Sequence, residues 1–301
     1  MEPTPCALLE HEPLAPHLFW RIGGPADLYA EPRTEAELLH CLRLARDRRL
    51  PVLALGGGSN LLVADGGFRG LAIAYQNQEE DQAIRGDRMR VRIGAGALLA
   101  PTGRRLSRLG WAGLEWAEGI PGTLGGAVAG NAGAYGGDIA SALHAVEVLA
   151  DAERFERWNL ADCAFGYRKS RFGAIGATSA FISAVTFLLR AEDPERLAAR
   201  MQAIGQERKA KTPAGLSCGS VFKNPEGASA GRLIEQAGLK GLEEGPAQVS
   251  PLHANYIVNR GGATADQVRR LIARIRAAVE KECGIRLEPE VRMIGFDPPQ
   301  S

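Results

Sequence analysis

The chain has 301 residues, of which 45% are hydrophobic and 24% are charged, and its formal net charge at neutral pH is +1. This length allows two or three domains with cores of their own, and the composition is ordinary for a globular protein. The near-zero charge excludes the strongly basic surface that attracts nucleic acids or anionic membranes, so we expect neither as a partner. Any bound anion must then be held locally, by backbone amides or single side chains.

The cysteine pattern argues against a disulfide framework or a metal site. The five cysteines follow no Cys-x-x-Cys or Cys/His ligand spacing, and their number is odd. Free thiols of this kind are typical of a reducing compartment. The N-terminus has no basic start followed by an apolar run, and no stretch reaches the apolar length that spans a bilayer. We therefore expect a cytoplasmic protein without a bound metal.

Strands and helices are predicted to alternate in the first 75 residues. Residues 34–37 read Thr-Glu-Ala-Glu, a capping box that begins a helix. Leu38, Leu42 and Ala45 then recur at helical spacing. Short apolar runs predict strands at residues 51–55, 61–63 and 71–74.

The middle of the chain begins near Gln76 and is predicted to form mostly β-strands. Residues 90–93 alternate charged and apolar side chains, as a half-exposed strand does. Residues 98–109 fit a helix closed by a glycine. The apolar runs 145–149 and 180–189 predict two more strands.

The last part of the chain begins with Asp193-Pro194, an N-cap followed by proline, and its first helix should run to about Lys211. A short helix is predicted at 227–237 and a strand at 256–258. Residues 264–267 form a second capping box before a helix that ends at Gly284. Its apolar face is Val268, Leu271, Ile272, Ile275 and Val279.

The first glycine turn follows the strand at 51–55 and reads Gly56-Gly57-Gly58-Ser59-Asn60. Backbone without Cβ atoms can point its amides at phosphate oxygens, so the turn is a candidate nest supported by the Ser59 and Asn60 side chains. It lacks the lysine of a P-loop, and the chain has no Gly-x-Gly-x-x-Gly motif. For this turn alone, a tight strand connection that needs glycine only for positive φ is the simpler interpretation.

The second glycine-rich stretch spans residues 119–126 and continues into 133–137. So many small residues cannot fill a conventional core, but they let a large flat ligand lie against backbone. Gly125 and Gly126 would open a helix toward a phosphate. A mobile surface loop is the alternative, and the low charge and apolar interruptions count against it. Two such turns, far apart in sequence, suggest one pyrophosphate held from two sides.

Three polar motifs are candidates for catalysis. Ser220 lies among small residues without a Gly-x-Ser-x-Gly elbow, so it fits a proton donor to a carbanion, or a local ST turn, better than an acyl-enzyme nucleophile. Arg168 belongs to the basic cluster 167–171 and could bind a carboxylate with its planar fork, although most such clusters are solvated faces. Glu290 follows a proline and could pair with Arg168 or face a substrate, although spacing alone favours an exposed strand residue.

In their order along the chain, these motifs resemble the UDP-N-acetylenolpyruvoylglucosamine reductase family, flavoenzymes that complete UDP-N-acetylmuramate in peptidoglycan synthesis. The resemblance covers about residues 21–294, and the ordered set is specific although each motif alone is weak. The motifs are Arg-Ile-Gly-Gly-Pro-Ala at 21–26, Gly-Gly-Gly-Ser-Asn-Leu-Leu at 56–62, Gly-Ile-Pro-Gly-Thr-Leu-Gly-Gly at 119–126, Asn-Ala-Gly-Ala-Tyr-Gly at 131–136, Tyr-Arg-Lys-Ser at 167–170, Gly-Ser-Val-Phe-Lys-Asn-Pro at 219–225, His-Ala-Asn-Tyr-Ile-Val-Asn at 253–259 and Glu-Pro-Glu-Val at 288–291.

The resemblance implies an α+β protein with three domains. Residues 1–75 and 76–190 would form the two-part FAD-binding region of the vanillyl-alcohol-oxidase-like (PCMH-type) flavin fold, with FAD held non-covalently. Residues 191–301 would form the α+β substrate-binding domain. The long tyrosine-bearing insertion of some members is absent from this last part, which implies the shorter subclass. A monomer is expected.

The resemblance also implies the site residues. The catalytic residues would be Arg168, Ser220 and Glu290. The cofactor-binding residues would be Arg21, Gly56, Gly57, Gly58, Ser59, Asn60, Leu61, Gly119, Pro121, Gly122, Thr123, Gly125, Gly126, Asn131, Gly133 and Tyr135. The substrate-binding residues would be Tyr167, Lys223, Asn224, His253 and Asn255.

The implied reaction reduces the enolpyruvyl group of UDP-N-acetylglucosamine enolpyruvate at the expense of NADPH. Hydride from the flavin would add to the terminal alkene carbon, and Ser220 would deliver a proton to the α-carbon. Arg168 and Glu290 would stabilise the negative charge that develops between these two events. Lys223 and Asn224 would hold the substrate's carboxylate or diphosphate.

Two alternatives remain open at the level of sequence. One is an oxidase of the same flavin fold that acts on a sugar or an alcohol, often with flavin attached through a histidine, although no histidine lies in the glycine turns. The other is a flavin- or nucleotide-binding module without catalysis, which would leave the Ser220 and Glu290 motifs without a purpose.

Overall fold

The computed structural model describes residues 6–173 and 180–296, which form two compact units that interleave along the chain. Of the described residues, unit 1 comprises 6–10, 28–57, 70–173 and 180–208, and unit 2 comprises 11–27, 58–69 and 209–296. Residues 191–208 therefore group with unit 1 and not with the residues that follow them. The division into domains 1–75, 76–190 and 191–301 stays a prediction.

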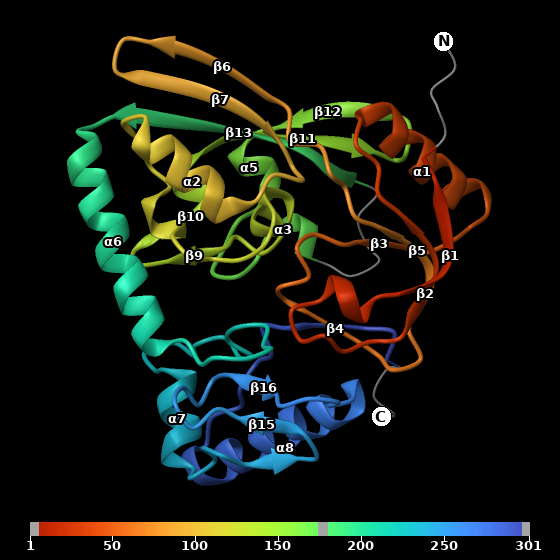
Figure 1. The fold of residues 1–301 in the computed structure, drawn as a ribbon, viewed down its shortest axis with the longest axis vertical. Coiled ribbons are helices and arrows are strands. Elements are labelled where there is room, and N and C mark those ends of the chain that lie inside the picture. The colour runs from red at the N-terminus through yellow and green to blue at the C-terminus, as the bar shows by residue number, and fades with distance from the viewer. Residues whose placement is uncertain (1–5, 174–179, 297–301) are drawn as a thin grey trace. The chain divides into compact units, whose positions relative to one another are not determined.

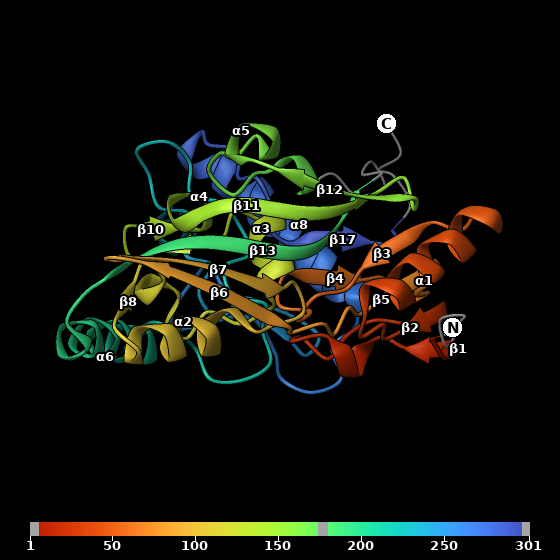
Figure 2. The same ribbon diagram turned by 90° about the horizontal axis from the view of Figure 1, so that it is seen from above.

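An antiparallel sheet forms the centre of unit 1 (Figures 1 and 2). Its strands, in spatial order, are β12 (Arg154–Trp158), β11 (Leu143–Ala150), β13 (Ala180–Ala191), β7 (Arg88–Gly94) and β6 (Glu80–Arg85), and β8 (Trp111–Ala112) pairs with the end of β13. Residues 180–187 of β13 are buried apart from Phe181, because this central strand is covered on both faces. The strands predicted at 90–93, 145–149 and 180–189 are confirmed.

Helices accompany the strands of unit 1. They are α1 (Glu35–Asp47), α2 (Leu99–Arg108), α3 (Leu124–Ala129), α4 (Ile139–Ala142), α5 (Leu160–Cys163) and α6 (Pro194–Lys211), with single 3₁₀ turns at Glu115–Ala117 and Arg171–Gly173. The start of α1 is as predicted, since the Thr34 hydroxyl accepts from the Glu37 amide at 3.2 Å. The Glu37 carboxylate, however, accepts from the Arg33 amide and not from that of Thr34.

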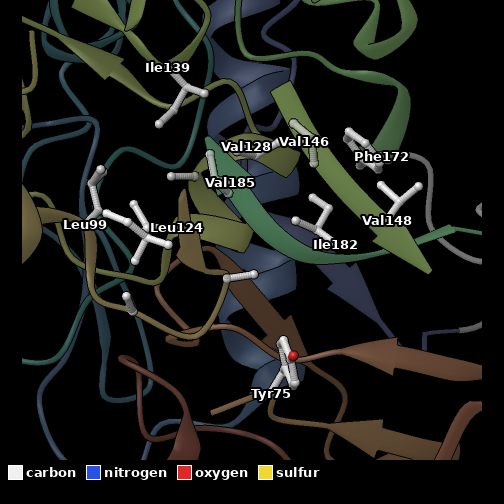
Figure 3. Packing of buried hydrophobic residues seen from close by; sticks show 14 of the residues in the cluster. Tyr75, Leu99, Leu124, Val128, Ile139, Val146, Val148, Phe172, Ile182 and Val185 are labelled. Atoms are coloured by element: carbon white, nitrogen blue, oxygen red, sulfur yellow. The ribbon is translucent and has the colours of Figure 1, made fainter. Parts of the chain in front are cut away.

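The core of unit 1 lies between the sheet and these helices. Figure 3 shows Leu124 and Val128 of α3 beside Val185 of β13, and all three side chains are fully buried. Burying an aliphatic side chain of this size contributes about 1.5–3 kcal/mol relative to leaving it exposed. The small glycine-rich helix α3 is therefore anchored to the sheet through its apolar face.

Two smaller sheets accompany these elements. One has the order β1 (Leu8–Pro13), β2 (Pro25–Ala30), β5 (Phe68–Ile73) and β3 (Val52–Ala54), and the other is the hairpin of β9 (Gly133–Ala134) and β10 (Gly137–Asp138). Strands β3 and β5 are parallel, and the Leu55 amide donates to the Ile73 carbonyl at 2.9 Å. This pairing fixes the point at which the first glycine turn leaves the sheet.

Unit 2 is built around one long amphipathic helix. Its elements are β4 (Leu61–Val63), α7 (Ala230–Gln236), β14 (Glu243–Glu244), β15 (Ala247–Val249), β16 (Ile257–Asn259), α8 (Ala265–Cys283) and β17 (Arg292–Ile294), with a 3₁₀ turn at Ala15–His17. The predicted capping box of Thr264 and Gln267 starts α8, and Gly284 in a left-handed conformation ends it. The five predicted apolar positions of α8 are all buried, so its predicted face is confirmed.

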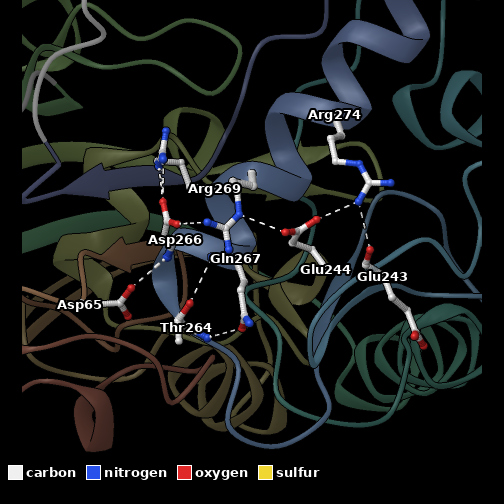
Figure 4. A network of polar contacts seen from close by, with 9 residues as sticks. Asp65, Glu243, Glu244, Thr264, Asp266, Gln267, Arg269 and Arg274 are labelled. Atoms are coloured by element: carbon white, nitrogen blue, oxygen red, sulfur yellow. Dashed lines mark hydrogen bonds and ion pairs between the residues drawn. The ribbon is translucent and has the colours of Figure 1, made fainter.

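A carboxylate from the loop after β4 satisfies the first amides of α8. Asp65 accepts from Ala265 at 2.7 Å and from Asp266 at 3.0 Å, as Figure 4 shows in part. Helix N-termini leave such amides without internal partners and favour negative charge. The loop is thereby tied to α8 at a sequence distance that no local pattern would reveal.

None of the helices in the described ranges is long and apolar enough to cross a membrane.

Candidate active site

The two glycine turns predicted to work together are in direct contact within unit 1. A Cβ atom added to Gly56 would lie 2.7 Å from the Thr123 hydroxyl, and one added to Gly57 would lie 2.7 Å from the Gly122 Cα atom. Real Cβ atoms do not approach other atoms so closely, so only glycine lets these two backbone segments meet. Both turns therefore present backbone, without side chains, at one place in unit 1.

The amides of the first turn are available to a ligand. Within the residues that the structure describes, those of Gly56, Gly57 and Gly58 donate to no protein acceptor, and Gly58 is buried. Buried backbone amides are nearly always paired, so a group with acceptor oxygens is expected here. An anionic pyrophosphate has such oxygens, and the three amides therefore fit the predicted FAD.

The amides at the start of α3 are already used by the protein. Leu124 donates to Ala97 at 2.8 Å, Gly125 donates to Ala95 at 2.9 Å, and Gly126 donates to the Thr123 hydroxyl at 3.3 Å. The expectation that Gly125 and Gly126 open a helix toward a phosphate is therefore not supported in that form. At Gly125 the lack of a side chain serves close packing, because a Cβ there would lie 3.2 Å from that of Ala95.

Three other predicted cofactor residues make contacts within their own units. Gly119 has a φ of 72° and would bring a Cβ within 3.0 Å of the Arg208 side chain. In unit 2, Arg21 also has positive φ, and its guanidinium donates to the Pro16 carbonyl. Leu61 is buried in β4, where it pairs with Arg292. Contacts of these residues with FAD remain predictions.

Asn131 holds the third glycine-rich segment in place. Its side chain is buried, donates to the Gly166 carbonyl at 3.0 Å and accepts from the Ala140 amide at 3.2 Å. The predicted cofactor contact of Asn131 would have to come from other atoms than these. In the same segment the Gly133 carbonyl accepts a hydrogen bond, and Tyr135 is 40% exposed.

Arg168 lies in a tight turn that fixes its direction. Gly166 and Lys169 exchange backbone hydrogen bonds of 2.9 and 3.1 Å, and Arg168 between them has a φ of 52°. Its guanidinium donates to the Gly133 carbonyl at 2.7 Å and lies 5.8 Å from the Tyr167 ring centroid. A non-glycine residue held at positive φ is uncommon and often functional. Arg168 is half-buried, unlike the solvated cluster that was the alternative.

Ser220 and Glu290 come from segments that pair with each other in unit 2. The Glu290 amide donates to the Val221 carbonyl at 2.8 Å, and the Lys223 amide donates to the Glu288 carbonyl at 2.9 Å. Burial, with a smaller contribution from the negative charge of Glu290, raises the pKa of the Cys218 thiol. The charge of Glu290 is therefore felt at Cys218, in the segment that carries Ser220.

Asn60 links the first glycine turn to this paired segment. Its side-chain amide donates to the Glu290 carbonyl at 3.1 Å, and its own carbonyl accepts from the Arg292 amide at 3.1 Å. Asn60 was predicted to bind the cofactor, and the structure gives its side chain the task of positioning the Glu290 backbone. The two residues are 230 positions apart, so the sequence held no local signal of this contact.

The predicted substrate residues of unit 2 also make defined local contacts. Lys223 pairs with the Glu288 carboxylate at 2.5 Å, and Asn224 accepts from the Ala230 amide at the start of α7. His253 accepts from the Asn255 amide at 3.3 Å, and burial lowers the pKa of its ring. The sequence interpretation missed Glu288, whose only signal was its place in the same short motif as Glu290.

Asn255 is a positioning residue in this structure. Its side chain is 4% exposed, accepts from the Phe222 amide at 2.9 Å and donates to the Phe222 carbonyl at 2.8 Å. Its backbone carbonyl also accepts from Val221 at 2.8 Å. These three bonds hold the extended segment that follows Ser220. The geometry supports this role for Asn255 better than the predicted contact with substrate.

Comparison with known proteins gives the class of protein. The family described as FAD binding domain matches residues 26–156, and the family described as UDP-N-acetylenolpyruvoylglucosamine reductase, C-terminal domain, matches residues 211–294. The first match contains both glycine turns. The chain is thus an FAD-dependent oxidoreductase with an FAD-binding region and a C-terminal α+β domain.

Relatives of the same length give the family. The chain is 48% identical over 296 residues to the UDP-N-acetylenolpyruvoylglucosamine reductase of Chloroflexus aggregans. The aligned region covers 97% of this chain and 99% of that protein. The reductase of the same name from Chloroflexus aurantiacus is 48% identical over 292 residues, with coverages of 96% and 98%. A crystal structure of the reductase from Thermus caldophilus matches with a TM-score of 0.80 and 36% identity, over 96% of this chain and 98% of that one. The chain belongs to the UDP-N-acetylenolpyruvoylglucosamine reductase family.

This membership confirms the resemblance stated from the motifs and the FAD cofactor that it implied. The oxidase and the non-catalytic module fall away as alternatives. The agreement in length also fits the shorter subclass.

Proposed function

We propose that the protein reduces the enolpyruvyl group of UDP-N-acetylglucosamine enolpyruvate to give UDP-N-acetylmuramate, with NADPH as reductant. The observation that carries the proposal is the pairing of the Ser220 and Glu290 segments in unit 2, in a member of this reductase family. That pairing supplies a hydroxyl and a carboxyl group from one small framework. A monomeric state and a cytoplasmic location are further parts of the proposal and rest on the sequence alone.

The proposed flavin site uses the backbone where the two glycine turns meet. The amides of Gly56, Gly57 and Gly58 would bind the pyrophosphate of FAD without a covalent link. Thr123 and Gly122 would form the opposite wall. When bound, FAD supplies hydride transfer, from NADPH to the terminal carbon of the substrate's double bond.

Ser220 would complete the reduction by giving a proton to the α-carbon. Hydride at one carbon and a proton at the other convert the double bond into a saturated ether, and the reducing equivalents come from NADPH. A serine hydroxyl is a weak acid, so it suits an acceptor as basic as the developing carbanion. The segment that follows Ser220 is fixed by Asn255, which supports a constant position for the hydroxyl.

Arg168 and Glu290 would stabilise the negative charge that develops on the α-carbon and its carboxylate. The guanidinium can bind the carboxylate with two parallel hydrogen bonds. Glu290 could donate a hydrogen bond only in its protonated form. Groups of this kind, fixed before the reaction, act like an oxyanion hole, and losing one such donor raises the barrier by about 3–4 kcal/mol.

The proposal is tested by separating the two half-reactions without oxygen. NADPH should bleach the yellow holoenzyme, and UDP-N-acetylglucosamine enolpyruvate should then restore the oxidised flavin spectrum. A reduced enzyme that this substrate leaves bleached would refute the proposed function.

The role of Ser220 is tested in the same stopped-flow experiment. Ser220→Ala should leave reduction by NADPH nearly intact and slow reoxidation by substrate by several decades. The matched control is Ser229→Ala, since Ser229 precedes α7 without a side-chain capping bond, and it should leave both rates unchanged. Equal slowing of both half-reactions in Ser220→Ala would contradict proton donation.

A further inference from the structure

A row of three arginines crosses neighbouring strands of the large sheet in unit 1. Arg85 of β6 lies directly opposite Arg88 of β7, and Arg88 lies directly opposite Arg190 of β13. Residues opposite each other on antiparallel strands project to the same face, and like charges in this position destabilise the pairing. All three arginines are exposed.

Protein carboxylates hardly neutralise this row. In the described part of the chain, its single ion pair joins Arg88 to the adjacent Asp87 at 3.9 Å, with both side chains more than half exposed. Such an exposed pair contributes little. Arg92, further along β7, shows the contrast, since it pairs with Glu147 at 2.6 Å and Glu35 at 2.7 Å. The row therefore lacks carboxylate partners like those of Arg92, which lies on the same strand as Arg88.

Arg88 and Arg190 line a cavity of about 390 Å³ in unit 1. The other walls come from β8, the β9–β10 hairpin, α4 and α6, of which Figure 2 labels β8, β10, α4 and α6. The cavity's own acids, Glu115 and Glu192, both pair with Arg200. The positive charge of Arg88 and Arg190 is thus not balanced by the acids that share the cavity with them.

The cavity also has an aromatic and aliphatic side. Trp116, Tyr135 and Leu188 contribute to its lining, and Leu188 precedes Arg190 by two residues on the same face of β13. The Trp116 ring is fixed, because its indole donates to the Gly113 carbonyl at 3.0 Å and the Gly137 backbone packs directly on it. The volume is within the range of small-molecule sites, which is about 300–1,000 Å³.

We propose that this cavity binds a small organic phosphate, with Arg88 and Arg190 holding the phosphate and the Trp116 side receiving an apolar or ring-shaped ester group. Guanidinium groups suit phosphate because they offer parallel N–H donors in a planar fork. The anion also removes the like-charge repulsion within the row. The lining shares only Tyr135 with the predicted FAD-binding residues, and the test measures binding, so it does not depend on turnover.

The test is calorimetric titration of the FAD-loaded protein with phenyl phosphate at low ionic strength, with inorganic phosphate and phenol as the two halves of the probe. Phenyl phosphate should bind more tightly than either half. Arg88→Gln and Arg190→Gln should each weaken binding about tenfold, as expected for one lost charge-assisted interaction. The control is Arg43→Gln, which removes the same charge from an exposed position of α1 and should leave the affinity unchanged.

A second measurement uses thermal unfolding of the same proteins. Without ligand, Arg88→Gln should unfold at a higher temperature than the wild type, because it relieves repulsion on both sides of β7. Phenyl phosphate should raise the unfolding temperature of the wild type and have little effect on the variant.

The proposal is overturned by any of three results. They are no binding of phenyl phosphate at millimolar concentration, equal binding by wild type and both arginine variants, and loss of binding when NADPH or the enolpyruvyl substrate is present in saturating amount. The last result would place the probe in the reductase site.

Discussion

Replacing Asn255 by alanine should destabilise unit 2 and leave the reduction of the flavin by NADPH unchanged. The asparagine side chain makes both of its hydrogen bonds to the backbone of Phe222, at 2.9 and 2.8 Å. Phe222 is 1% exposed, so water would not replace the lost partners. The perturbation therefore orphans one buried donor and one buried acceptor.

The magnitude follows from these two groups. Leaving one buried donor or acceptor unpaired costs about 1–3 kcal/mol, so the pair gives about 2–6 kcal/mol, and we expect about 3–4 kcal/mol. Domains of this kind have a total unfolding free energy of about 5–15 kcal/mol, so the change should be easy to detect. Asn255→Asp keeps an acceptor for the Phe222 amide but loses the donor to its carbonyl, and it should also destabilise the unit.

The assay is urea unfolding followed by tryptophan fluorescence. Trp20 is the one tryptophan of the sequence that falls in unit 2, and its indole donates to the Ile257 carbonyl at 2.8 Å in the buried core. Gln248→Ala is the matched control, since the Gln248 amide makes an exposed bond to Glu243, and its effect should stay within about 0.5 kcal/mol.

Activity measurements separate this role from a contact with substrate. If Asn255 positions the segment after Ser220, Asn255→Ala should lose stability and slow the substrate half-reaction. A loss of stability below about 1 kcal/mol, together with a raised KM, would refute the reasoning and favour the substrate contact expected from the sequence.

Two further predictions concern the glycine turns and the titration of unit 2. In a fluorescence titration, Gly57→Ala should weaken FAD binding about tenfold or more, because its Cβ would lie 2.7 Å from the Gly122 backbone. The control is Gly130→Ala, which should retain FAD because its Cβ has only an ordinary contact of 3.7 Å. Burial lowers the pKa of His253, so its contribution to stability is present above the unfolded pKa of about 6.5 and is lost as pH falls through the folded pKa. Wild-type stability from urea unfolding should therefore decline more steeply below about pH 6.5 than that of His253→Gln, and parallel curves would contradict this.

Much of the secondary structure could be predicted because its determinants are close together in sequence. The capping boxes at Thr34 and Thr264 and the apolar spacing after them specify α1 and α8. The twelve-residue strand β13 was visible as an apolar run. Two-residue strands such as β8 gave no signal, since their pairing depends on a partner far along the chain.

The ordered motifs likewise determined the family, and the glycine turns predicted where backbone would meet a flavin. Only the tertiary structure decided which amides are available for that task. It satisfies those of Gly125 and Gly126 and leaves those of Gly56, Gly57 and Gly58 without protein acceptors. The sequence contains the donors, but their acceptors are set by which segments the fold brings together.

The same reason explains the roles of Asn60 and Asn255. As residue types in motifs, both could be ligands for cofactor or substrate. The fold gives their amides to the backbone of Glu290 and Phe222, at separations of 230 and 33 residues. The donors and the acceptor of an asparagine side chain can serve a ligand or the framework, and only its three-dimensional neighbours decide between them.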